Sequence, residues 1–303
     1  MFTVTEDSTN RDLPAGLDLH SAREHYLALR EGFVSRLAPP VVTQHNDKWI
    51  FRGDLSQVSL KGYGAEQLVA QAESDTLVYV APRAGMAPNA IATLAGIYGK
   101  KCVFFCPAAK ELSVHQRALL YHGAELRFAK IVRMPNLNGW AKKWADERGY
   151  CYLPPGLSDQ PLVTAGLVKL ASFISKHIGH DPTEVWMSVS TGTAIRAFQI
   201  AWPDTDIRGI AVARNMQSGE IGRARLTGSA LPFLKPVAKE LRPPFDSTVN
   251  YDAKCWTLFE EQAAPGSIFI NVGSDAVIQS QYEQVKDVYV NSQRAWGDKQ
   301  DLL

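Results

Sequence analysis

The sequence predicts an α/β protein in which parallel sheets are covered by helices. Short apolar segments rich in Val, Ile and Phe alternate along the chain with segments of helical periodicity, and short connections join them. Glycine follows three of the helical segments, at Gly99, Gly123 and Gly149, where it is typical of a helix C-terminus. This alternation favours parallel strands, because each crossover connection lays a helix against the sheet.

The first half of the chain contains most of this alternation. A helix over residues 17–37, ended by Pro39-Pro40, precedes two short strands at 41–42 and 49–51. Apolar segments then predict strands at 76–80, 102–105 and 125–129. Helical periodicity predicts the helices between them, at 61–73, 89–98, 114–122 and 137–148.

The second half begins after residues 151–159, whose Pro and Gly content marks a crossing between domains. A long amphipathic helix follows at 163–177. Further strands are expected at 185–189, 207–213 and 267–272, with helices at 194–202 and 253–262. Residues 214–250 lack clear periodicity, and a stretch of that length usually has a function or local structure of its own. Residues 275–303 are expected to form a helix and a polar tail.

Composition excludes several classes of protein. The 303 residues are 46% hydrophobic and carry a formal net charge of +1, so there is no overall basic field for nucleic acid. The sequence contains no run of about 18 apolar residues, so it predicts no membrane-spanning helix. Its polar start lacks the apolar core of a signal peptide. We therefore expect a cytoplasmic protein. The four cysteines have no partner Cys/His pair at a zinc-like interval, so no metal is expected.

A loop of hydroxyl residues and glycine, Ser190-Thr191-Gly192-Thr193, lies between a predicted strand and a predicted helix. Hydroxyl groups, a glycine and the first backbone amides of a helix are the groups that bind phosphate. An ordinary helix N-cap remains an equal alternative, because Ser and Thr favour that position. No Gly-Lys-Ser/Thr triplet follows, so the loop is not a Walker A motif.

Two more segments could carry chemistry. Lys61 follows Leu60 between a strand and a helix, and a desolvated lysine is a nucleophile or a base. The alternative is a solvated surface lysine. The segment Arg83-Ala84-Gly85-Met86-Ala87-Pro88 connects a buried strand to a helix. Ligands of parallel sheets bind beyond the carboxyl ends of the strands, although this segment could also be a structural turn.

In their order along the chain, these segments resemble the fold type II family of pyridoxal phosphate (PLP) enzymes. This family includes tryptophan synthase β, threonine deaminase, cysteine synthase and D-cysteine desulfhydrase. Its lysine motif, a strand with basic and acidic residues and then Ser-Phe-Lys, is similar to Ile50-Phe51-Arg52-Gly53-Asp54-Leu55 followed by Ser59-Leu60-Lys61. Its next loop, Ser-x-Gly-Asn-His-Gly, corresponds to Arg83–Pro88. The other matching segments are the small-residue helix Ala90–Gly96, Gly123-Ala124-Glu125, Ser190–Thr193 and Ile270-Asn271-Val272-Gly273-Ser274.

The resemblance spans roughly residues 36 to 275 and implies a two-domain fold with parallel-type twisted sheets covered by helices. The smaller domain is expected over 46–154. The larger domain, which carries the phosphate loop, is expected over 1–45 and 155–303.

The resemblance also implies a cofactor and a reaction. Lys61 would hold PLP as a Schiff base and later act as the base for the α-proton. The phosphate would bind to Ser190, Thr191, Gly192 and Thr193, and the pyridine nitrogen to Ser274. The implied enzyme is a lyase or a β-replacement transferase of amino-acid metabolism, with a small amino-acid-like substrate and a homodimeric assembly.

The chain also departs from the family pattern. The family's asparagine beside the phenolic oxygen of the cofactor aligns with Met86, which cannot make that hydrogen bond. Asn89, one helical turn further on, is the candidate to replace it. Arg83 stands where the family has serine, and with Ala84, Gly85 and Met86 it is expected to bind substrate, the guanidinium holding an anionic group.

These departures leave two other functions open. One is a repurposed or catalytically inactive protein with the same pocket. The other is PLP chemistry on an amino acid carried by a macromolecule such as modified nucleic acid. A surface for such a partner would come from the basic residues of segment 214–250, namely Arg214, Arg223, Arg225 and Lys235, and a solvated basic loop is the simpler alternative.

Overall fold

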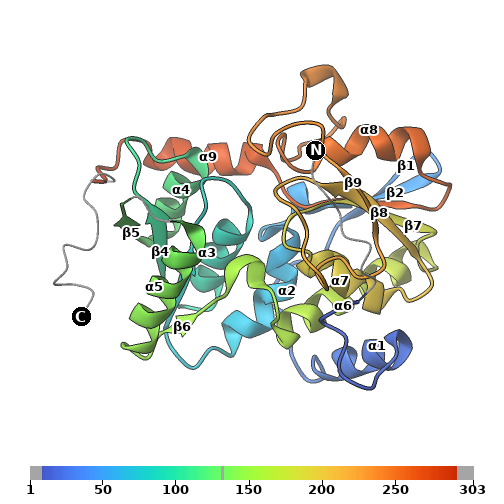
Figure 1. Cartoon of the computed structure of the whole chain (residues 1–303), viewed down its shortest axis with the longest axis horizontal. Coiled ribbons are helices and arrows are strands. Elements are labelled where there is room, and N and C mark those ends of the chain that lie inside the picture. Colours follow the sequence, from blue (N-terminus) through green and yellow to red (C-terminus); the bar gives the residue numbers. More distant parts are fainter. Residues whose placement is uncertain (1–8, 131–132, 292–303) are drawn as a thin grey trace. The chain divides into compact units, whose positions relative to one another are not determined.

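The computed structural model describes residues 9–130 and 133–291, which form two compact units (Figure 1). The first unit consists of the described residues up to Gln67 together with Ser158–Asp275. The second consists of Leu68–Leu157 and the described residues from Ala276 onward. Each unit is built around one sheet.

The sheet of the first unit has six strands in the order β1-β2-β10-β7-β8-β9. β1 and β2 form an antiparallel hairpin, and all other neighbours pair in parallel. Along the sheet, the strands are β1 (Val42–His45), β2 (Lys48–Arg52), β10 (Ile268–Asn271), β7 (Glu184–Val189), β8 (Asp206–Ala211) and β9 (Arg225–Gly228). The central strands β7 and β10 are buried along their whole length, as expected for parallel strands covered on both faces.

The α-helices of this unit, among the described residues, are α1 (Leu19–Ala28), most of α2 (Ser59–Ala70), α6 (Pro161–Ile178), α7 (Thr193–Ala201) and α8 (Ala253–Gln262). α1 begins at Asp18, whose side chain accepts a hydrogen bond from the backbone N–H of Ser21. α6 packs against α1 and α7, whereas α8 lies against β7 and β8. The apolar face of α8 contributes Trp256 and Phe259 to an aromatic core with Phe269 of β10.

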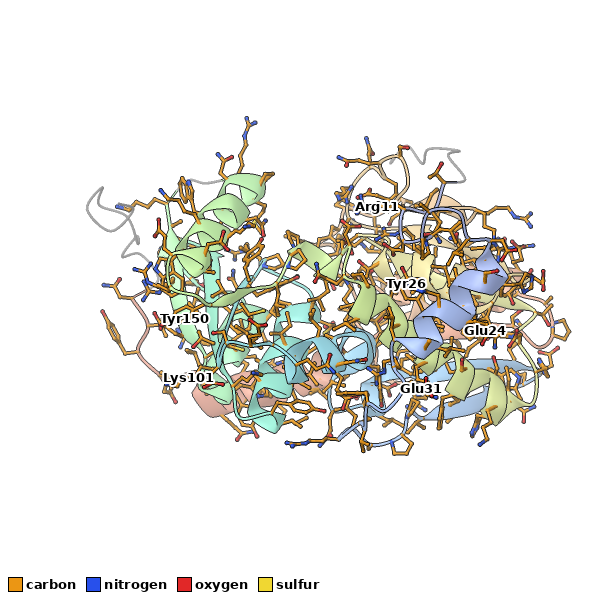
Figure 2. All side chains as sticks on the ribbon, turned by 90° about the horizontal axis from the view of Figure 1, so that it is seen from below. Arg11, Glu24, Tyr26, Glu31, Lys101 and Tyr150 are labelled. Carbon is orange, nitrogen blue, oxygen red and sulfur yellow. The ribbon has the colours of Figure 1, made fainter. Side chains whose placement is uncertain are left out.

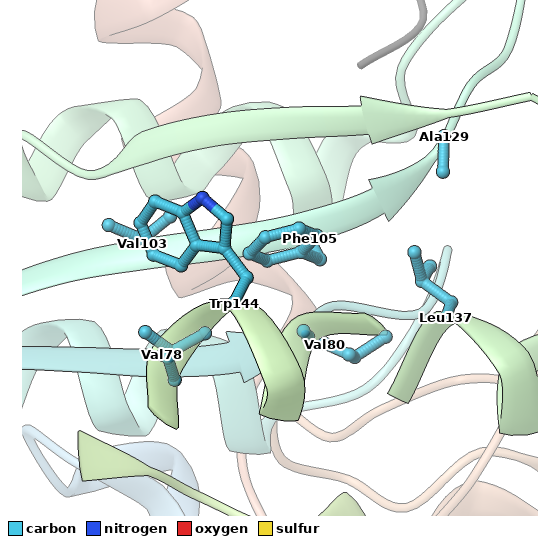
Figure 3. Close-up of a cluster of buried hydrophobic side chains, with 9 residues drawn as sticks. Val78, Val80, Val103, Phe105, Ala129, Leu137 and Trp144 are labelled. Atoms are coloured by element: carbon cyan, nitrogen blue, oxygen red, sulfur yellow. The ribbon is translucent and has the colours of Figure 1, made fainter. Parts of the chain in front are cut away.

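The sheet of the second unit is entirely parallel, in the order β5-β4-β3-β6. Its strands are β5 (Glu125–Ala129), β4 (Lys101–Pro107), β3 (Thr76–Val80) and β6 (Cys151–Tyr152), and its helices are α3 (Ala87–Ile97), α4 (Val114–Ala118), α5 (Met134–Asp146) and most of α9 (Asp275–Val285). Trp144 of α5 packs edge-on to Phe105 of β4, with ring centroids 5.5 Å apart, and Val78 and Val80 of β3 line the same cluster (Figure 3). The helix-covered parallel sheets of both units confirm the predicted fold class.

One predicted helix is shorter than the sequence indicates. The segment 17–37 is helical only over Leu19–Ala28. Gly32 adopts a left-handed conformation (φ 74°), and the buried carboxylate of Glu66 on α2 accepts hydrogen bonds from the Ser35 hydroxyl and the Arg36 backbone N–H. These contacts hold the segment in an irregular path along α2.

The expected domain boundaries also differ from the observed division. β2 is hydrogen-bonded to β10 in register Ile50 with Phe269, so residues 48–52 belong to the sheet of the first unit and not to a domain that begins at residue 46. The crossing expected at residue 154 lies between Leu157 and Ser158. The described residues from Ala276 onward group with the second unit, where the sequence had assigned them to the larger domain.

No helix among residues 9–130 and 133–291 is both long enough and apolar enough to cross a bilayer. The same residues contain no group of three or more His, Cys, Asp or Glu side chains arranged to hold a metal ion. All four cysteines carry free thiols, and Cys102, Cys106 and Cys255 are buried. Burial raises the pKa of the Cys102 and Cys106 thiols to about 12, which makes them inert small hydrophobic side chains.

Two helical glycines differ in the space around them. A Cβ on Gly166 of α6 would lie 2.5 Å from the carbonyl oxygen of Gly64 and 2.7 Å from that of Tyr63, whereas a Cβ on Gly139 of α5 would meet nothing within 4 Å. We expect Gly166→Ala to lower the free energy of unfolding by about 1–3 kcal/mol, because backbone must move. Gly139→Ala, the matched control, should raise it by about 0.5–1 kcal/mol. Urea denaturation measures both, and equal effects would show that α2 and α6 are not in close backbone contact.

Candidate functional site

The chain places Lys61 in the first turn of α2 through close backbone packing at the end of the sheet. Gly53 follows β2, and a Cβ there would overlap the carbonyl oxygen of Asn271 at the end of β10. Six residues later Ser59 takes a left-handed conformation (φ 57°), and the N–H of Leu60 donates to the carbonyl oxygen of Val272 at 2.9 Å. Lys61 is therefore fixed at the carboxyl end of the parallel strands, where ligands of such sheets bind.

The side chain of Lys61 reaches the predicted phosphate loop. Its Nζ donates to Thr191 Oγ1 at 3.2 Å, although the two residues are 130 positions apart in the sequence. Burial, with a smaller contribution from the positive charge of Arg196, lowers the pKa of Lys61 to about 7. Near neutral pH a large fraction of Lys61 is thus a neutral amine, the form that acts as nucleophile or base.

The loop Ser190–Thr193 follows β7 and opens α7 as the sequence predicts. Gly192 has φ 75°, and a Cβ there would overlap the carbonyl oxygen of Glu220, so only glycine fits. The hydroxyls of Thr191 and Thr193 are 3.3 Å apart, and that of Thr193 is 2.9 Å from the hydroxyl of Ser158. The loop therefore presents two hydroxyl groups beside the first turn of a helix, where backbone N–H groups favour an anion.

The end of β10 supplies the third part of the site in the first unit. Ser274 is buried there. The Asn271 amide donates to Asp54 Oδ1 at 2.8 Å and to the Asp246 carbonyl oxygen at 2.8 Å. The side-chain oxygen of Asn271, Oδ1, is buried and has no hydrogen-bond partner among the described residues. A buried acceptor without a partner is a place where a bound group with an N–H or O–H could be satisfied.

Asp252 lies beside this strand end and is fully buried. Its carboxylate accepts from the Val272 N–H at 3.1 Å and from the Thr248 hydroxyl at 2.7 Å. Burial outweighs these hydrogen bonds and raises the pKa of Asp252 to about 8. The carboxyl group is thus largely protonated at neutral pH.

In the second unit, Arg83, Ala84, Gly85 and Met86 connect β3 to α3. Arg83 is exposed, and Met86 precedes α3 without a side-chain capping bond. The amide nitrogen of Asn89 donates to Gln281 of α9 and lies 3.4 Å from His122 Nε2. Asn89 therefore already has partners within its own unit, and its role toward a cofactor stays a prediction.

The structure brings together some of the predicted residues. Lys61, Thr191 and Thr193 are linked by hydrogen bonds, with Gly192 between the two threonines. Ser274 follows β10 and lies two residues after Val272, whose carbonyl oxygen accepts a hydrogen bond from the Leu60 N–H of α2. Arg83, Ala84, Gly85 and Met86, which the sequence predicts to bind substrate, belong to the second unit.

Comparison with solved structures identifies the fold. The ACC deaminase homologue is 16% identical over 84% of this chain and 98% of its own, with a TM-score of 0.69. Threonine deaminase isoform 2 from Solanum lycopersicum is 12% identical over 95% of this chain and 100% of its own, with a TM-score of 0.65. The chain shares the fold of threonine deaminase. A pyridoxal 5'-phosphate-dependent aspartate racemase is similar as well, at 15% identity over 85% of this chain and 94% of its own, with a TM-score of 0.58.

The threonine deaminase fold is the type II fold that the sequence predicts, and the prediction is confirmed. No protein-family profile and no curated protein sequence matches the chain. Identities of 10–17% show the fold, so the chemistry has to be argued from the side chains of this chain.

Sequence reasoning missed three residues around the site: Arg196, Asp12 and Asp252. Arg196, in the first turn of α7, is the one charged residue of a mostly apolar helix, and this isolated charge was a usable signal. Asp12 lies in a segment without periodicity, and nothing local marks it. Asp252 precedes α8 and looks like an ordinary helix N-cap, although its side chain makes no capping bond.

The basic residues of segment 214–250 are largely used inside the first unit. Arg214 pairs with Glu220, and Arg225 pairs with Asp206 at 2.7 Å. Arg223 donates to two backbone carbonyl groups at 2.7 and 2.9 Å. Arginines held in these ion pairs and hydrogen bonds are less available to the phosphate groups of a nucleic acid.

The lowered pKa of Lys61 predicts that its side chain destabilises the folded protein. Its pKa is about 7 in the folded state and 10.5 without the shift, so the unfolded state binds more protons between these values and stability rises with pH there. Below pH 7 the cost of burying the ammonium group is fully present. We expect Lys61→Met, without cofactor, to be more stable than wild type at pH 6 by on the order of 3–5 kcal/mol, at about 1.4 kcal/mol per pKa unit.

This advantage should shrink as the pH rises from 7 toward 10. Urea denaturation at pH 6, 7.5 and 9 measures it, with Lys169→Met, an exposed position on α6, as the matched control. A difference that does not depend on pH would mean that Lys61 is charged in the folded protein.

Proposed function

We propose that this chain is a PLP-dependent enzyme that removes the α-proton of an amino-acid-type substrate and then eliminates or replaces a β-substituent. The observation that carries the proposal is the 3.2 Å contact between Lys61 Nζ and Thr191 in a loop suited to phosphate, together with the lowered pKa of that lysine. Structures with this fold include threonine deaminase, a diaminopropionate ammonia lyase and a pyridoxal 5'-phosphate-dependent aspartate racemase, which supports the same class of chemistry.

The residues of the first unit fit the cofactor. Ser190, Thr191, Gly192 and Thr193 would hold its phosphate, since Gly192 lets backbone and hydroxyl groups converge at the start of α7. Lys61 would hold its aldehyde carbon through Nζ. At the end of β10, Ser274 is the proposed partner of the pyridine nitrogen. The side-chain oxygen of Asn271, buried and without a hydrogen-bond partner among the described residues, is a further acceptor near this strand end and supports the proposal.

The side chains of the site have different roles in the proposed reaction. PLP, when bound, withdraws electrons from the α-carbon of an attached amino acid and makes its α-proton acidic. Lys61 Nζ accepts that proton, which requires the neutral amine that burial favours. The Thr191 hydroxyl, 3.2 Å away, orients Nζ. The side chains that contact the substrate determine which β-substituent leaves. We propose that the Arg83–Met86 loop provides these side chains.

The alternative is a repurposed protein that retains the lysine and the phosphate loop but lacks turnover. Two observations favour it: Met86 cannot donate a hydrogen bond to the cofactor, and the Asn89 amide already binds Gln281. The two functions differ in a simple experiment. A protein that binds PLP at Lys61 but turns over none of a panel of β-substituted amino acids belongs to the alternative.

Chemical trapping should place the cofactor on Lys61. We expect borohydride treatment of the protein incubated with PLP to leave one pyridoxyl group, which peptide mapping by mass spectrometry locates at Lys61. Lys61→Met should take up no label above background, and Lys169→Met, at an exposed helix position, should label as wild type does. Label on another lysine, or its absence from wild type, would refute the assignment.

Arg83 provides a test of the substrate loop. If its exposed guanidinium binds an anionic group of the substrate, Arg83→Ala should raise KM about tenfold or more for the amino acid that wild type converts fastest, with little change in PLP affinity. The control is Lys101→Ala, which removes another exposed cation of the second unit (Figure 2). An unchanged KM would make Arg83 a surface residue, and a collapse of PLP affinity would assign it to the cofactor.

A further inference from the structure

A fully buried arginine lies directly behind the phosphate loop. Arg196 is in the first turn of α7 and its side chain is 0% exposed. All other residues of that helix from Ala194 to Ala201 are apolar except Gln199. A buried guanidinium is costly unless its charge and its N–H groups are matched, so its partners show what it is held for.

The guanidinium divides its hydrogen bonds between the loop and an acid. Nη1 donates to the carbonyl oxygens of Thr191 and Glu220, each at 3.2 Å. The missing side chain of Gly192 makes room for the Glu220 carbonyl oxygen, which a Cβ would overlap, and for Arg196 Nη1, which a Cβ would approach to 2.9 Å. Nε and Nη2 donate to the two carboxylate oxygens of Asp12 at 2.8 and 3.3 Å.

The acid comes from the N-terminal strap, by which we mean residues Asn10–Asp12. The Asn10 amide donates to the Arg196 carbonyl oxygen at 3.0 Å, and its own oxygen accepts from the Asp12 N–H at 3.0 Å. The hydroxyl of Tyr26 on α1 donates to the Asp12 carbonyl oxygen, and Arg11 pairs with Asp159 at 3.0 Å; Figure 2 labels Tyr26 and Arg11. The strap is thus tied down on both sides of Asp12.

We propose that Arg196 is a positioning residue for the phosphate loop and that Asp12 is the counter-charge that keeps it there, an inference that rests on the function proposed above. Arg196 fixes the Thr191 carbonyl group, and this orients the Thr191 hydroxyl toward Lys61. Its charge also disfavours the ammonium form of Lys61, in addition to the larger effect of burial. The same charge favours an anion at the loop.

A merely structural ion pair would behave differently. Its loss would lower stability but would weaken the binding of PLP and of pyridoxal by the same factor, because the two compounds share the aldehyde and the ring and differ only in the phosphate. A residue that positions the phosphate loop changes the ratio of the two affinities. This ratio also cancels any effect on Lys61, since Lys61 reacts with both compounds.

The experiment measures both affinities by absorption titration for wild type, Arg196→Gln and Asp12→Asn. Asp12→Asn removes the negative charge but keeps the shape and one acceptor, so it carries the test even if Arg196→Gln does not fold. The matched control is Glu184→Gln, which removes another buried acid with an arginine partner, Arg208 at 3.0 Å, at the opposite end of β7.

We expect PLP affinity relative to pyridoxal to fall about tenfold or more in Arg196→Gln and Asp12→Asn, and to stay unchanged in Glu184→Gln. Arg196→Lys, which keeps the charge but cannot reach both carbonyl groups and Asp12, should recover part of the loss. An unchanged ratio in folded Asp12→Asn would overturn the proposal.

Orthophosphate separates this inference from the proposed function. If wild type forms no reducible link at Lys61 with either aldehyde, the proposed function is wrong. Arg196 is then judged by calorimetric titration with inorganic phosphate: binding by wild type that both variants lose supports its role. Equal phosphate binding by wild type and variants, or none by wild type, overturns it.

Discussion

The site of the first unit depends on one close backbone contact, the packing of the turn after β2 against the end of β10. Gly53 lies so close to the Asn271 carbonyl group that no side chain fits, and the Leu60 N–H reaches the Val272 carbonyl oxygen. These contacts fix where α2 begins and therefore where Lys61 stands. Because β7 is the next strand across the sheet from β10, the same contact sets the distance from Lys61 to the Ser190–Thr193 loop.

Several polar groups at this end of the sheet are held in forms that cost stability. The Lys61 amine, the protonated Asp252 and the Arg196–Asp12 pair are all buried. Each would be unfavourable without a compensating role or a partner. A group of buried ionisable residues at the carboxyl end of one sheet is typical of a functional site.

The sequence predicted what depends on local pattern. The alternation of strands and helices, the Ser190–Thr193 loop and the helix ends at Gly99, Gly123 and Gly149 follow from short-range chemistry. The predicted helix over 17–37 is too long. Ser35 and Arg36 donate hydrogen bonds to Glu66, about thirty positions further along the chain, and local pattern does not encode these contacts. The Arg196–Asp12 pair joins residues 184 positions apart, and no pattern in one sequence encodes such a contact.

The order of strands has a consequence for how the two units reach their folds. The sheet of the second unit uses strands from one continuous stretch, 76–152. Its β3–β4 and β4–β5 pairings join neighbouring strands in the sequence, and only the β3–β6 pairing, Leu77 with Cys151, closes a longer loop. The sheet of the first unit has β10 at its centre, between β2 and β7, although β10 is the last strand in the part of the chain that the structure describes. β2 therefore lacks its inner neighbour until residues 268–271 arrive, more than two hundred positions later. Pairings of such separation form slowly. Until then the edge of β2 opposite β1 has no strand partner and is open to wrong ones.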